Sequence, residues 1–308
     1  MKKIALFVLI ISMCFSLCGC FDYEEIKKLT MVSGIGIDYK NDNYIITAEI
    51  ASMLQEGEQV RDSAKPKIIK SKGKTLYSAL QSLNAENGGA LFLKGCTLCI
   101  IGFDVAKSGT KEIGRFVLNN PDLPQTMEFI ISEEYASDIF KASPETNQLL
   151  CKELTDSITE DSQNTATAIP CNVCDVFEGK NLFISKVKRI KRKASLSGIY
   201  YIEDDKITSE ANIKTAPYLL LFEGVGGKCV LPLGDAGDFY VTSSLKENNK
   251  LKIEGSLFLK NDNTQIKTNR INQILNRDFR NAIKKTLNRN ENIDIELTIK
   301  AQNLNTEE

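Results

Sequence analysis

The sequence contains neither histidine nor tryptophan in its 308 residues. Histidine is the usual general base of Ser-His and Cys-His catalysis, a common metal ligand and the usual pH switch near neutrality. Its absence excludes all of these in their ordinary form, so an enzyme would have to work with carboxylates, Lys, Tyr or Cys. No carboxylate pair is placed by its spacing for acid–base chemistry either. We therefore expect no enzyme and no cofactor.

An excess of charge of one sign is also lacking. The formal net charge is −1, whereas a general nucleic-acid binder is usually clearly basic. We therefore expect no nucleic-acid partner. The remaining composition, 42% hydrophobic and 26% charged residues, is that of an ordinary folded protein. The length allows one large domain or two to three small ones.

The apolar run at the N-terminus is too short to span a membrane comfortably. Residues 4–17 form an uncharged, mostly apolar run of 14 residues behind Lys2 and Lys3, whereas a transmembrane helix needs about 20. A positive start followed by an apolar run of this length is typical of a signal peptide. The alternative is a buried N-terminal helix.

The end of this run contains a sorting signal. The segment Leu17-Cys18-Gly19-Cys20 resembles the bacterial lipobox, in which an apolar residue and two small residues precede a cysteine. In that class of signal the cysteine is acylated, with chains such as palmitate, and becomes the mature N-terminus. Several acyl chains anchor a protein firmly, since each buried methylene contributes about 0.8 kcal/mol. We expect removal of residues 1–19 and lipidation of Cys20; a plain secretory signal is the alternative.

Hydrophobic periodicity predicts a mixture of strands and helices in the first half of the chain. Leu76, Ala79, Leu80 and Leu83 have i, i+3, i+4, i+7 spacing, which indicates a helix over 75–84. Strands are expected over residues 30–38, 44–53, 90–102 and 126–131. Further helices are expected over residues 111–119 and 132–141 and from Ser143 past Ile158. Polar residues 55–67 predict a loop.

The second half begins with a polar, irregular stretch over 161–174, which predicts a linker. Short strands are expected from Leu182 to about Thr242. The clearest pattern is at the C-terminus, where alternating apolar residues predict strands over 251–259 and 293–299. Between them, apolar residues over 271–287 fall on one face of a long helix. The sequence therefore predicts a C-terminal strand-helix-strand unit.

Two CxxC pairs, Cys96/Cys99 and Cys171/Cys174, have the ligand type of a structural zinc site. Cys96 and Cys99 lie in an expected strand, where residues three apart point to opposite faces, so convergence on one ion is disfavoured. We expect no metal site and interpret Cys96, Cys99 and Cys151 as buried free thiols. A disulfide between Cys171 and Cys174 stays open as an alternative, because the chain is expected to be exported.

A dense basic run lies near the middle of the chain. Six basic residues fall in one eight-residue window: Lys186, Lys188, Arg189, Lys191, Arg192 and Lys193. Each positive charge near a membrane surface contributes about 1 kcal/mol to the binding of anionic lipid. We therefore predict contact between this run and a membrane or an acidic partner. The alternative is a solvated, edge-like strand whose lysines block aggregation.

The residues after the lipobox carry a family resemblance. The opening Gly19-Cys20-Phe21-Asp22 and the strand ending in Gly34-Ile35-Gly36-Ile37-Asp38 resemble the start of the Ger(x)C family, the C subunits of spore germinant receptors. The helix start Gly73-Lys74-Thr75-Leu76, the apolar segment 91–102 and the helix end Leu118-Asn119-Asn120-Pro121-Asp122 are similar to later features of that family. The resemblance runs from Cys20 to about Thr242 and continues more loosely to the end.

Three departures from the family pattern stand out. Phe21 stands where Trp is usual, and Cys96 stands near a position where the family often has His. The segment that usually follows the last helix is missing after Ala301. We therefore expect a shortened last domain.

The resemblance implies an α+β lipoprotein of several small mixed-sheet domains flanked by helices. The expected parts are a signal peptide at 1–19, an N-terminal domain at 20–180, a middle domain at 181–240 and a C-terminal domain at 241–308.

In function, the resemblance implies a non-catalytic, lipid-anchored subunit of a spore germinant receptor on the outer face of the spore inner membrane. Its partners would be polytopic membrane subunits, together with membrane lipid through Cys20. Its role would be assembly of the complex that triggers germination in response to nutrients. The alternative is an envelope lipoprotein that binds a small ligand on its own. Cys20 is the one residue to which the resemblance gives a defined role.

Overall fold

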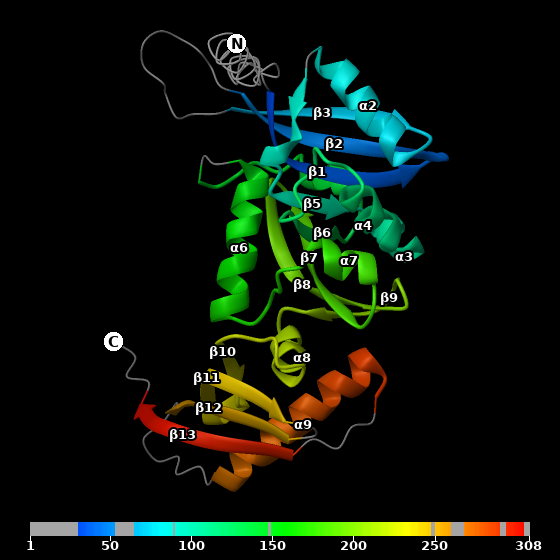
Figure 1. Ribbon diagram of the computed structural model, residues 1–308. Helices are drawn as coiled ribbons and strands as arrows, with labels where there is room; N and C mark the ends of the chain where they lie inside the picture. The colour runs from blue at the N-terminus through cyan, green and yellow to red at the C-terminus, as the bar shows by residue number, and fades with distance from the viewer. Residues whose placement is uncertain are drawn as a thin grey trace, which may run out of the picture.

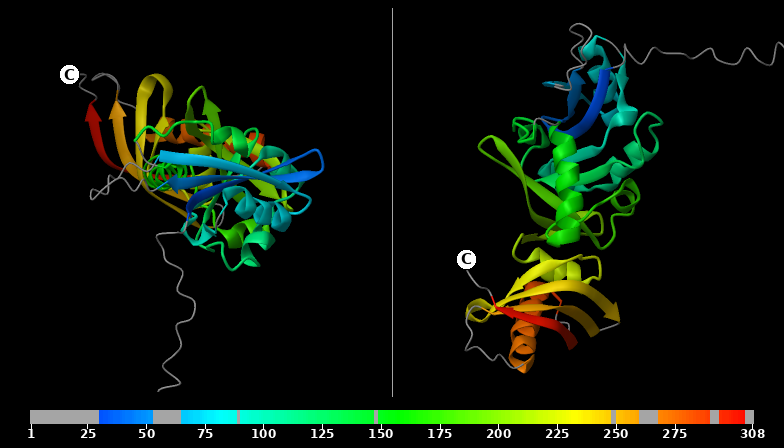
Figure 2. Two further views of the ribbon diagram at one scale, coloured as in Figure 1. Left: turned by 90° about the horizontal axis from the view of Figure 1, so that it is seen from above. Right: turned by 90° about the vertical axis from the view of Figure 1, so that its left-hand side faces the viewer.

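The computed structural model describes residues 30–52, 65–88, 90–146, 149–247, 250–259, 268–289 and 294–304. Two mixed sheets lie one beyond the other along the length of the molecule, and helices cover them (Figure 1, Figure 2). One sheet has nine strands and the other has four. This architecture confirms the predicted α+β class.

The larger sheet has the order β3-β2-β1-β5-β6-β7-β8-β9, and β4 also pairs with β1. Strands β1, β5, β6 and β7 run parallel to their neighbours in this series, and the outer pairs are antiparallel. The strands are β1 (Thr30–Lys40), β2 (Asn43–Ser52), β3 (Lys65–Gly73), β4 (Leu91–Phe92), β5 (Leu98–Ile101), β6 (Glu128–Ser132), β7 (Leu182–Ile190), β8 (Lys193–Glu203) and β9 (Lys206–Asn212).

Helices lie on both faces of this sheet. One face packs against α2 (Leu76–Asn87), α3 (Phe103–Ser108), α4 (Lys111–Leu118) and α7 (Val173–Glu178) in a single apolar cluster. The opposite face packs against α5 (Ala136–Ile139) and α6 (Leu150–Asn164). Alternate residues of the central strands divide between the two clusters: Cys99 and Ile101 lie in the first, Leu98 and Ile100 in the second. This alternation is the pattern of a strand buried on both sides.

Several predicted elements are confirmed. The strands expected over 30–38 and 44–53 are β1 and β2, joined by a tight turn in which Asn41 and Asp42 have positive φ, as two-residue hairpins require. Helix α2 buries all four apolar residues of the predicted spacing. It begins at a capping box of Thr75 and Ser78 and ends at Gly88, whose φ is 70°. The helix expected over 111–119 is α4, and the strand expected over 126–131 is β6.

The single strand predicted over 90–102 is wrong. It is divided into β4, a 3-10 turn at η2 (Leu93–Gly95) and β5, and both strands pair with β1. The pairing of β1 with β2 shifts register between Val32 and Gly34, so β1 is irregular at the same level as the break between β4 and β5. The loop predicted over 55–67 is also wrong at its end, because β3 begins at Lys65 and its residues pair along β2.

The helices predicted after β6 and in the following segment begin later than expected. Ser132 is the last residue of β6, and its hydroxyl accepts from Glu134 N, so the chain turns before α5 begins at Ala136. Ser143 and Pro144 precede no helix directly; α6 begins at Leu150. The predicted apolar face of α6 is confirmed, since its residues Leu150, Leu154 and Ile158 are buried.

The segment predicted as a linker over 161–174 is part of the folded body. Helix α6 continues to Asn164, and Asn172 caps α7 with a capping box. Ala166, Ala168 and Cys171 are buried, and Ile169 exchanges hydrogen bonds with the Ser185 hydroxyl on β7. The buried residues of this segment are mostly small and lie among polar ones, so no apolar run indicated this packing.

The smaller sheet has the order β10-β11-β12-β13. Its strands are β10 (Cys229–Pro232), β11 (Gly237–Glu247), β12 (Lys250–Leu259) and β13 (Asp294–Leu304), with a 3-10 turn η3 (Gly234–Ala236) before β11. Helix α9 (Thr268–Leu287) connects β12 to β13, which are parallel neighbours. The predicted strand-helix-strand unit is therefore confirmed.

Helix α8 (Ala216–Phe222) lies in the stretch from Leu182 to about Thr242, for which only short strands were predicted, so that prediction is wrong here. Every one of its residues is buried, and Pro217 lies in its first turn. A short, wholly apolar run has no polar face, so periodicity alone does not separate a buried helix from a buried strand.

The two sheets share apolar contacts through α8 and α9. Phe183 and Tyr201 of the larger sheet lie in one cluster with α8, α9 and the smaller sheet, and Arg289 donates a hydrogen bond to the Tyr201 hydroxyl at 3.0 Å. The division expected at 180/181 falls just before β7, within the larger sheet, and the one at 240/241 falls within β11. The division into domains stays a prediction.

Candidate functional site

Cys20, the predicted lipidation site, lies outside the residues that the structure describes. Its acylation stays a prediction. The motif that follows it, Gly34-Ile35-Gly36-Ile37-Asp38, is part of β1 and is fully described. Each of its glycines and its aspartate has a definable structural role.

Gly34 and Gly36 allow two helices to approach β1 closely. A Cβ atom on Gly34 would lie 2.2 Å from Cys151 Sγ of α6, and one on Gly36 would lie 2.6 Å from Cε2 of Phe140, just after α5. Both contacts are shorter than packed atoms allow, so a side chain at either position would force its neighbour to shift, and glycine permits the observed packing. Ile35 and Ile37 point to the other face and are fully buried there.

Asp38 caps helix α5. Its Oδ1 accepts a hydrogen bond from Ala136 N at 2.6 Å and its Oδ2 accepts one from Ser137 N at 2.9 Å. The carboxyl is buried, and burial raises its pKa, although the donated N–H groups act in the opposite direction. Asp38 therefore satisfies the free N–H groups at the start of a helix that has no cap of its own.

Glu49 of β2 does the same for α6. Its two oxygens accept hydrogen bonds from Leu150 N at 2.7 Å, from Cys151 N at 2.9 Å and from the Ser33 hydroxyl at 2.6 Å. The residue is 1% exposed. A buried carboxylate at a helix N-terminus gains charge-assisted hydrogen bonds and a favourable interaction with the helix dipole.

A third carboxylate, Asp205, caps α4 from the turn between β8 and β9. Its Oδ1 accepts from Thr110 N and Lys111 N, both at 2.7 Å. Asp204 and Asp205 have positive φ in this turn. All three carboxylates therefore accept hydrogen bonds from the backbone at helix starts, which gives them a positional rather than a chemical role.

The basic run is divided between two environments. Lys186 is buried within β7, with 6% of its surface exposed. Lys188 is half-buried, and the four that follow (Arg189, Lys191, Arg192 and Lys193) are exposed around the turn between β7 and β8. Strand β7 lies between β6 and β8, so it is not an edge strand. Its last three residues extend beyond the part that pairs with β6.

We call residues 188–193 the basic hairpin. Its turn is held by a hydrogen bond from Arg189 Nη1 to the Lys191 carbonyl at 2.6 Å, and Ser143 N donates to the Arg192 carbonyl at 2.8 Å. Lys193 pairs with Glu145 at 2.9 Å. Ile190 lies at the turn with 52% of its surface exposed. The basic hairpin therefore presents positive charge and one apolar side chain together.

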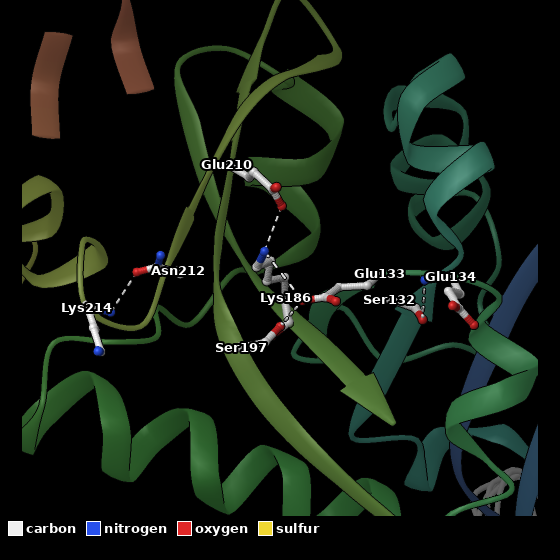
Figure 3. A network of polar contacts seen from close by, with 8 residues as sticks. All are labelled: Ser132, Glu133, Glu134, Lys186, Ser197, Glu210, Asn212 and Lys214. Atoms are coloured by element: carbon white, nitrogen blue, oxygen red, sulfur yellow. Dashed lines mark hydrogen bonds and ion pairs between the residues drawn. The ribbon is translucent and has the colours of Figure 1, made fainter. Parts of the chain in front are cut away.

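Lys186 lies in a pocket of the larger sheet (Figure 3). Its Nζ donates to Glu210 Oε2 at 2.7 Å and lies 3.4 Å from Glu133 Oε1. Ser197 donates its hydroxyl to the same Glu133 oxygen at 2.6 Å. Glu134, the next residue, points away from Lys186 in Figure 3. We call the group of Lys186, Glu133 and Glu210 the lysine pocket.

The lysine pocket has a volume of about 480 Å³ and opens to solvent. Tyr200 lies beneath the Lys186 ammonium, 5.3 Å from Nζ to the ring centre, and Phe103 packs against Tyr200 at 5.8 Å between ring centres. Burial raises the pKa of the Tyr200 hydroxyl, as do the charges of Glu210 and Glu133. The pocket therefore combines charged and aromatic surfaces.

The cysteines agree with the expectation of free thiols. Cys96, Cys99 and Cys151 are buried and free, as predicted, and so is Cys171; Cys174 is free and exposed, so the two do not form the alternative disulfide in this structure. Burial raises the pKa of Cys96 to about 12, which keeps its thiol protonated and unreactive at neutral pH. Within the described ranges, no group of His, Cys, Asp or Glu side chains is arranged to hold a metal ion.

Sequence reasoning missed the capping carboxylates and the partners of Lys186. Asp38 and Ala136 are 98 residues apart and Glu49 and Leu150 are 101 apart, so no local pattern joins them. For Glu49 there was a usable signal: it is an acidic residue inside an apolar strand, where an unpaired charge is costly.

These observations define an α+β protein whose Gly-x-Gly-x-Asp strand is packed by helices. A family model described as "Spore germination protein N-terminal domain" matches residues 22–181, more than half of the chain. The chain therefore belongs to this family of spore germination proteins, as the resemblance to the Ger(x)C family predicted.

Two curated relatives come from Bacillus subtilis (strain 168). The chain is 24% identical to "Spore germination protein B3" over 264 residues, which cover 82% of this chain and 70% of the relative. It is 26% identical to "Putative spore germination protein YfkR" over 153 residues, 48% of this chain and 40% of the relative. A solved structure titled "Crystal Structure of the GerBC protein" matches with a TM-score of 0.42 and 14% identity, covering 92% of this chain and 100% of that one.

In the described part of the chain, no helix is both long and apolar enough to cross a membrane.

Proposed function

We propose that the protein is a lipid-anchored, non-catalytic subunit of a spore germinant receptor, held by acylated Cys20 on the outer face of the spore inner membrane. The observation that carries the proposal is the family match beginning at Asp22, two residues after the lipobox cysteine. Its partners would be polytopic membrane subunits of the receptor. The protein would act by assembly, because its buried carboxylates hold helices in place rather than facing a substrate.

The anchor is tested with the full chain in its sporulating host. In Cys20→Ser the acyl-accepting thiol is replaced, so we expect loss of radioactive palmitate label and release of the protein from the inner-membrane fraction of spores. Cys174→Ser, which changes the exposed cysteine of α7, is the matched control and should keep both label and location. A Cys20→Ser protein that stays in the membrane fraction would contradict anchoring by lipid.

The receptor role is tested by co-purification. A tagged chain solubilised in mild detergent should bring down multi-span membrane proteins, and deletion of its gene should slow nutrient-triggered germination. Purification without any polytopic partner, in a strain that germinates normally, would overturn the role. Tight binding of a nutrient by the chain alone would favour the alternative, an envelope lipoprotein that binds a small ligand.

We further propose that the basic hairpin contacts anionic lipid head groups or an acidic partner surface. Lys186 is left out because its ammonium is buried and paired. The combination of exposed positive charge with exposed Ile190 suits a membrane interface, where each charge contributes about 1 kcal/mol.

The hairpin is tested on the unlipidated mature chain, residues 20–308 with Cys20→Ser. Lys191→Glu with Arg192→Glu should weaken sedimentation with vesicles that contain anionic lipid. Lys284→Glu with Lys285→Glu makes the same charge change on the exposed last turn of α9 and should weaken it less. Equal effects of the two pairs would contradict a specific contact, and no binding by the parent chain would exclude lipid.

A further inference from the structure

The lysine pocket lies where the loops of the larger sheet separate. Phe103 follows β5 after one residue and Glu133 follows β6 directly, so both lie at the carboxyl ends of parallel strands. The loop after β5 leads to α3 on one face of the sheet, and the loop after β6 leads to α5 on the other. In open sheets with parallel strands, ligands bind at the carboxyl edge where successive connections leave to opposite faces.

The charges in the pocket are not balanced. Lys186 supplies one positive charge, and Glu133 and Glu210 supply two negative ones. The Lys186 side chain is 8% exposed, that of Glu133 is 31% exposed and that of Glu210 is 59% exposed. The excess negative charge therefore lies at the open side of the pocket. One added cation would make the group neutral, which favours its binding.

The carboxylates also keep acceptors available. Lys186 and Ser197 use Glu133 Oε1, and Lys186 uses Glu210 Oε2. Among contacts within the described ranges, Glu133 Oε2 and Glu210 Oε1 make no hydrogen bond. An ammonium group has three donors, so it suits two carboxylate oxygens on either side of one site.

The remaining lining combines Thr208 and Ser209 with aromatic and apolar side chains. The rings of Phe103 and Tyr200 and the half-buried side chain of Ile207 border the pocket. Aromatic faces attract cations as well as apolar groups, and the volume of about 480 Å³ lies within the range of small-molecule sites.

We propose that the lysine pocket binds a small organic monocation, with its ammonium between Glu133 and Glu210 and its apolar body against Phe103 and Tyr200. This binding would be independent of lipid anchoring. A ligand of the opposite charge would instead have to displace Glu210 from Lys186.

The experiment uses NMR titration of the unlipidated mature chain with three probes of similar shape. Phenethylammonium is the cation, 2-phenylethanol its neutral counterpart and 3-phenylpropionate the anion. We expect saturable shifts around Glu133, Lys186 and Tyr200 with the cation at millimolar concentration, and weaker or no binding of the other two. No saturable shift with the cation, or tighter binding of the anion, would overturn the proposal.

Variants test whether the lysine pocket prefers a cation or an anion. Glu210→Gln removes the excess negative charge at an exposed position and should weaken binding of the cation about fivefold. Glu145→Gln makes the same change outside the pocket and should leave the affinity unchanged. Lys186→Met leaves both carboxylates unpaired and should make the cation bind more tightly. If Lys186→Met abolishes binding while the chain stays folded, or if Glu210→Gln and Glu145→Gln behave alike, the proposal is wrong.

Discussion

The two sheets of this protein use charge in different ways. In the larger sheet, carboxylates of Asp38 and Glu49 are buried and accept backbone hydrogen bonds from helices about a hundred residues away. In the smaller sheet, most described ion pairs are cross-strand and exposed, as for Lys252 with Glu247 and Lys250 with Glu296, and one further pair joins Lys246 of β11 to Glu223 at the end of α8. Its helix α9 is held by apolar packing instead. Buried carboxylates therefore help to position helices in the larger sheet, whereas α9 is positioned on the smaller sheet mainly by apolar packing.

The largest effect is expected from the apolar packing of the smaller sheet. Phe279 of α9 is fully buried and makes an edge-to-face contact with Tyr218 at 5.1 Å between ring centres. Phe279→Ala leaves a cavity and should lower the free energy of unfolding by about 4 kcal/mol. Urea unfolding of the unlipidated mature chain measures it, with Arg280→Ala on the exposed side of α9 as control. A loss no larger than that of the control would contradict this account of the smaller sheet.

Removal of the buried Glu49 carboxylate that caps α6 should have the next largest effect on the free energy of unfolding. Glu49→Ala leaves the N–H groups of Leu150 and Cys151 without acceptors in a buried site. We expect a loss of about 3 kcal/mol in the free energy of unfolding, measured in the same way. Glu49→Gln keeps the shape and one acceptor oxygen, so it should cost less. If both variants are as stable as the parent, the cap does not hold α6.

Substitution of Gly36, where Phe140 closely approaches β1, should have a moderate effect on the free energy of unfolding. Gly36→Ala would place a Cβ atom 2.6 Å from Phe140 Cε2, and overpacking of this kind costs about 2 kcal/mol. Phe140→Leu removes the contacting ring atom, so the double variant should lose less stability than the sum of the two single changes. Strict additivity in this cycle would show that the contact is not the cause.

The pH dependence of stability shows whether burial or hydrogen bonding has the larger effect on the pKa of Asp38. Because burial raises its pKa above the ordinary value of 3.8, its contribution to stability is fully present below the pKa of the unfolded chain and is lost as the pH rises through the folded pKa. Asp38→Asn cannot titrate, so the stability of the parent relative to this variant should fall as the pH rises through that window. Urea unfolding at a series of acidic pH values tests this, with Asp156→Asn as an exposed control. A relative stability that grows with pH would mean that the N–H donors outweigh burial.

The smallest effect is expected from the exposed pairs of the smaller sheet. Lys252→Ala breaks the pair with Glu247, whose two side chains are 40% and 52% exposed. Solvent and side-chain entropy cancel most of the value of such pairs, so the unfolding midpoint should stay within experimental error. A clear loss of stability would mean that charge holds this sheet too, and the contrast between the sheets would disappear.

The sequence was most informative where one pattern sufficed. The spacing in α2 and α9 and the alternation in β12 predicted those elements and their buried faces. It was least informative where an element depends on distant partners. Strand β3 is rich in lysine and is a strand because β2 is beside it, and α8 is too short and too apolar to show a period.

The candidate sites show the same limit. The basic run was visible, but not its division between a buried ammonium and an exposed hairpin, because that depends on where β6 and β9 lie. Asp38 was visible as the end of a motif, but its role depends on a helix that begins 98 residues later.

The pairing of β6 with β7 limits how this chain can be divided for laboratory work. The family match ends at residue 181, one residue before β7 begins. A fragment cut there would turn β6, with its buried Phe129, Ile130 and Ile131, into an open edge, and an unpaired apolar edge is a template for association between copies. Even a fragment that ends after β9 would uncover the apolar face beneath α8 and α9. The smallest piece with a protected interior therefore includes both sheets.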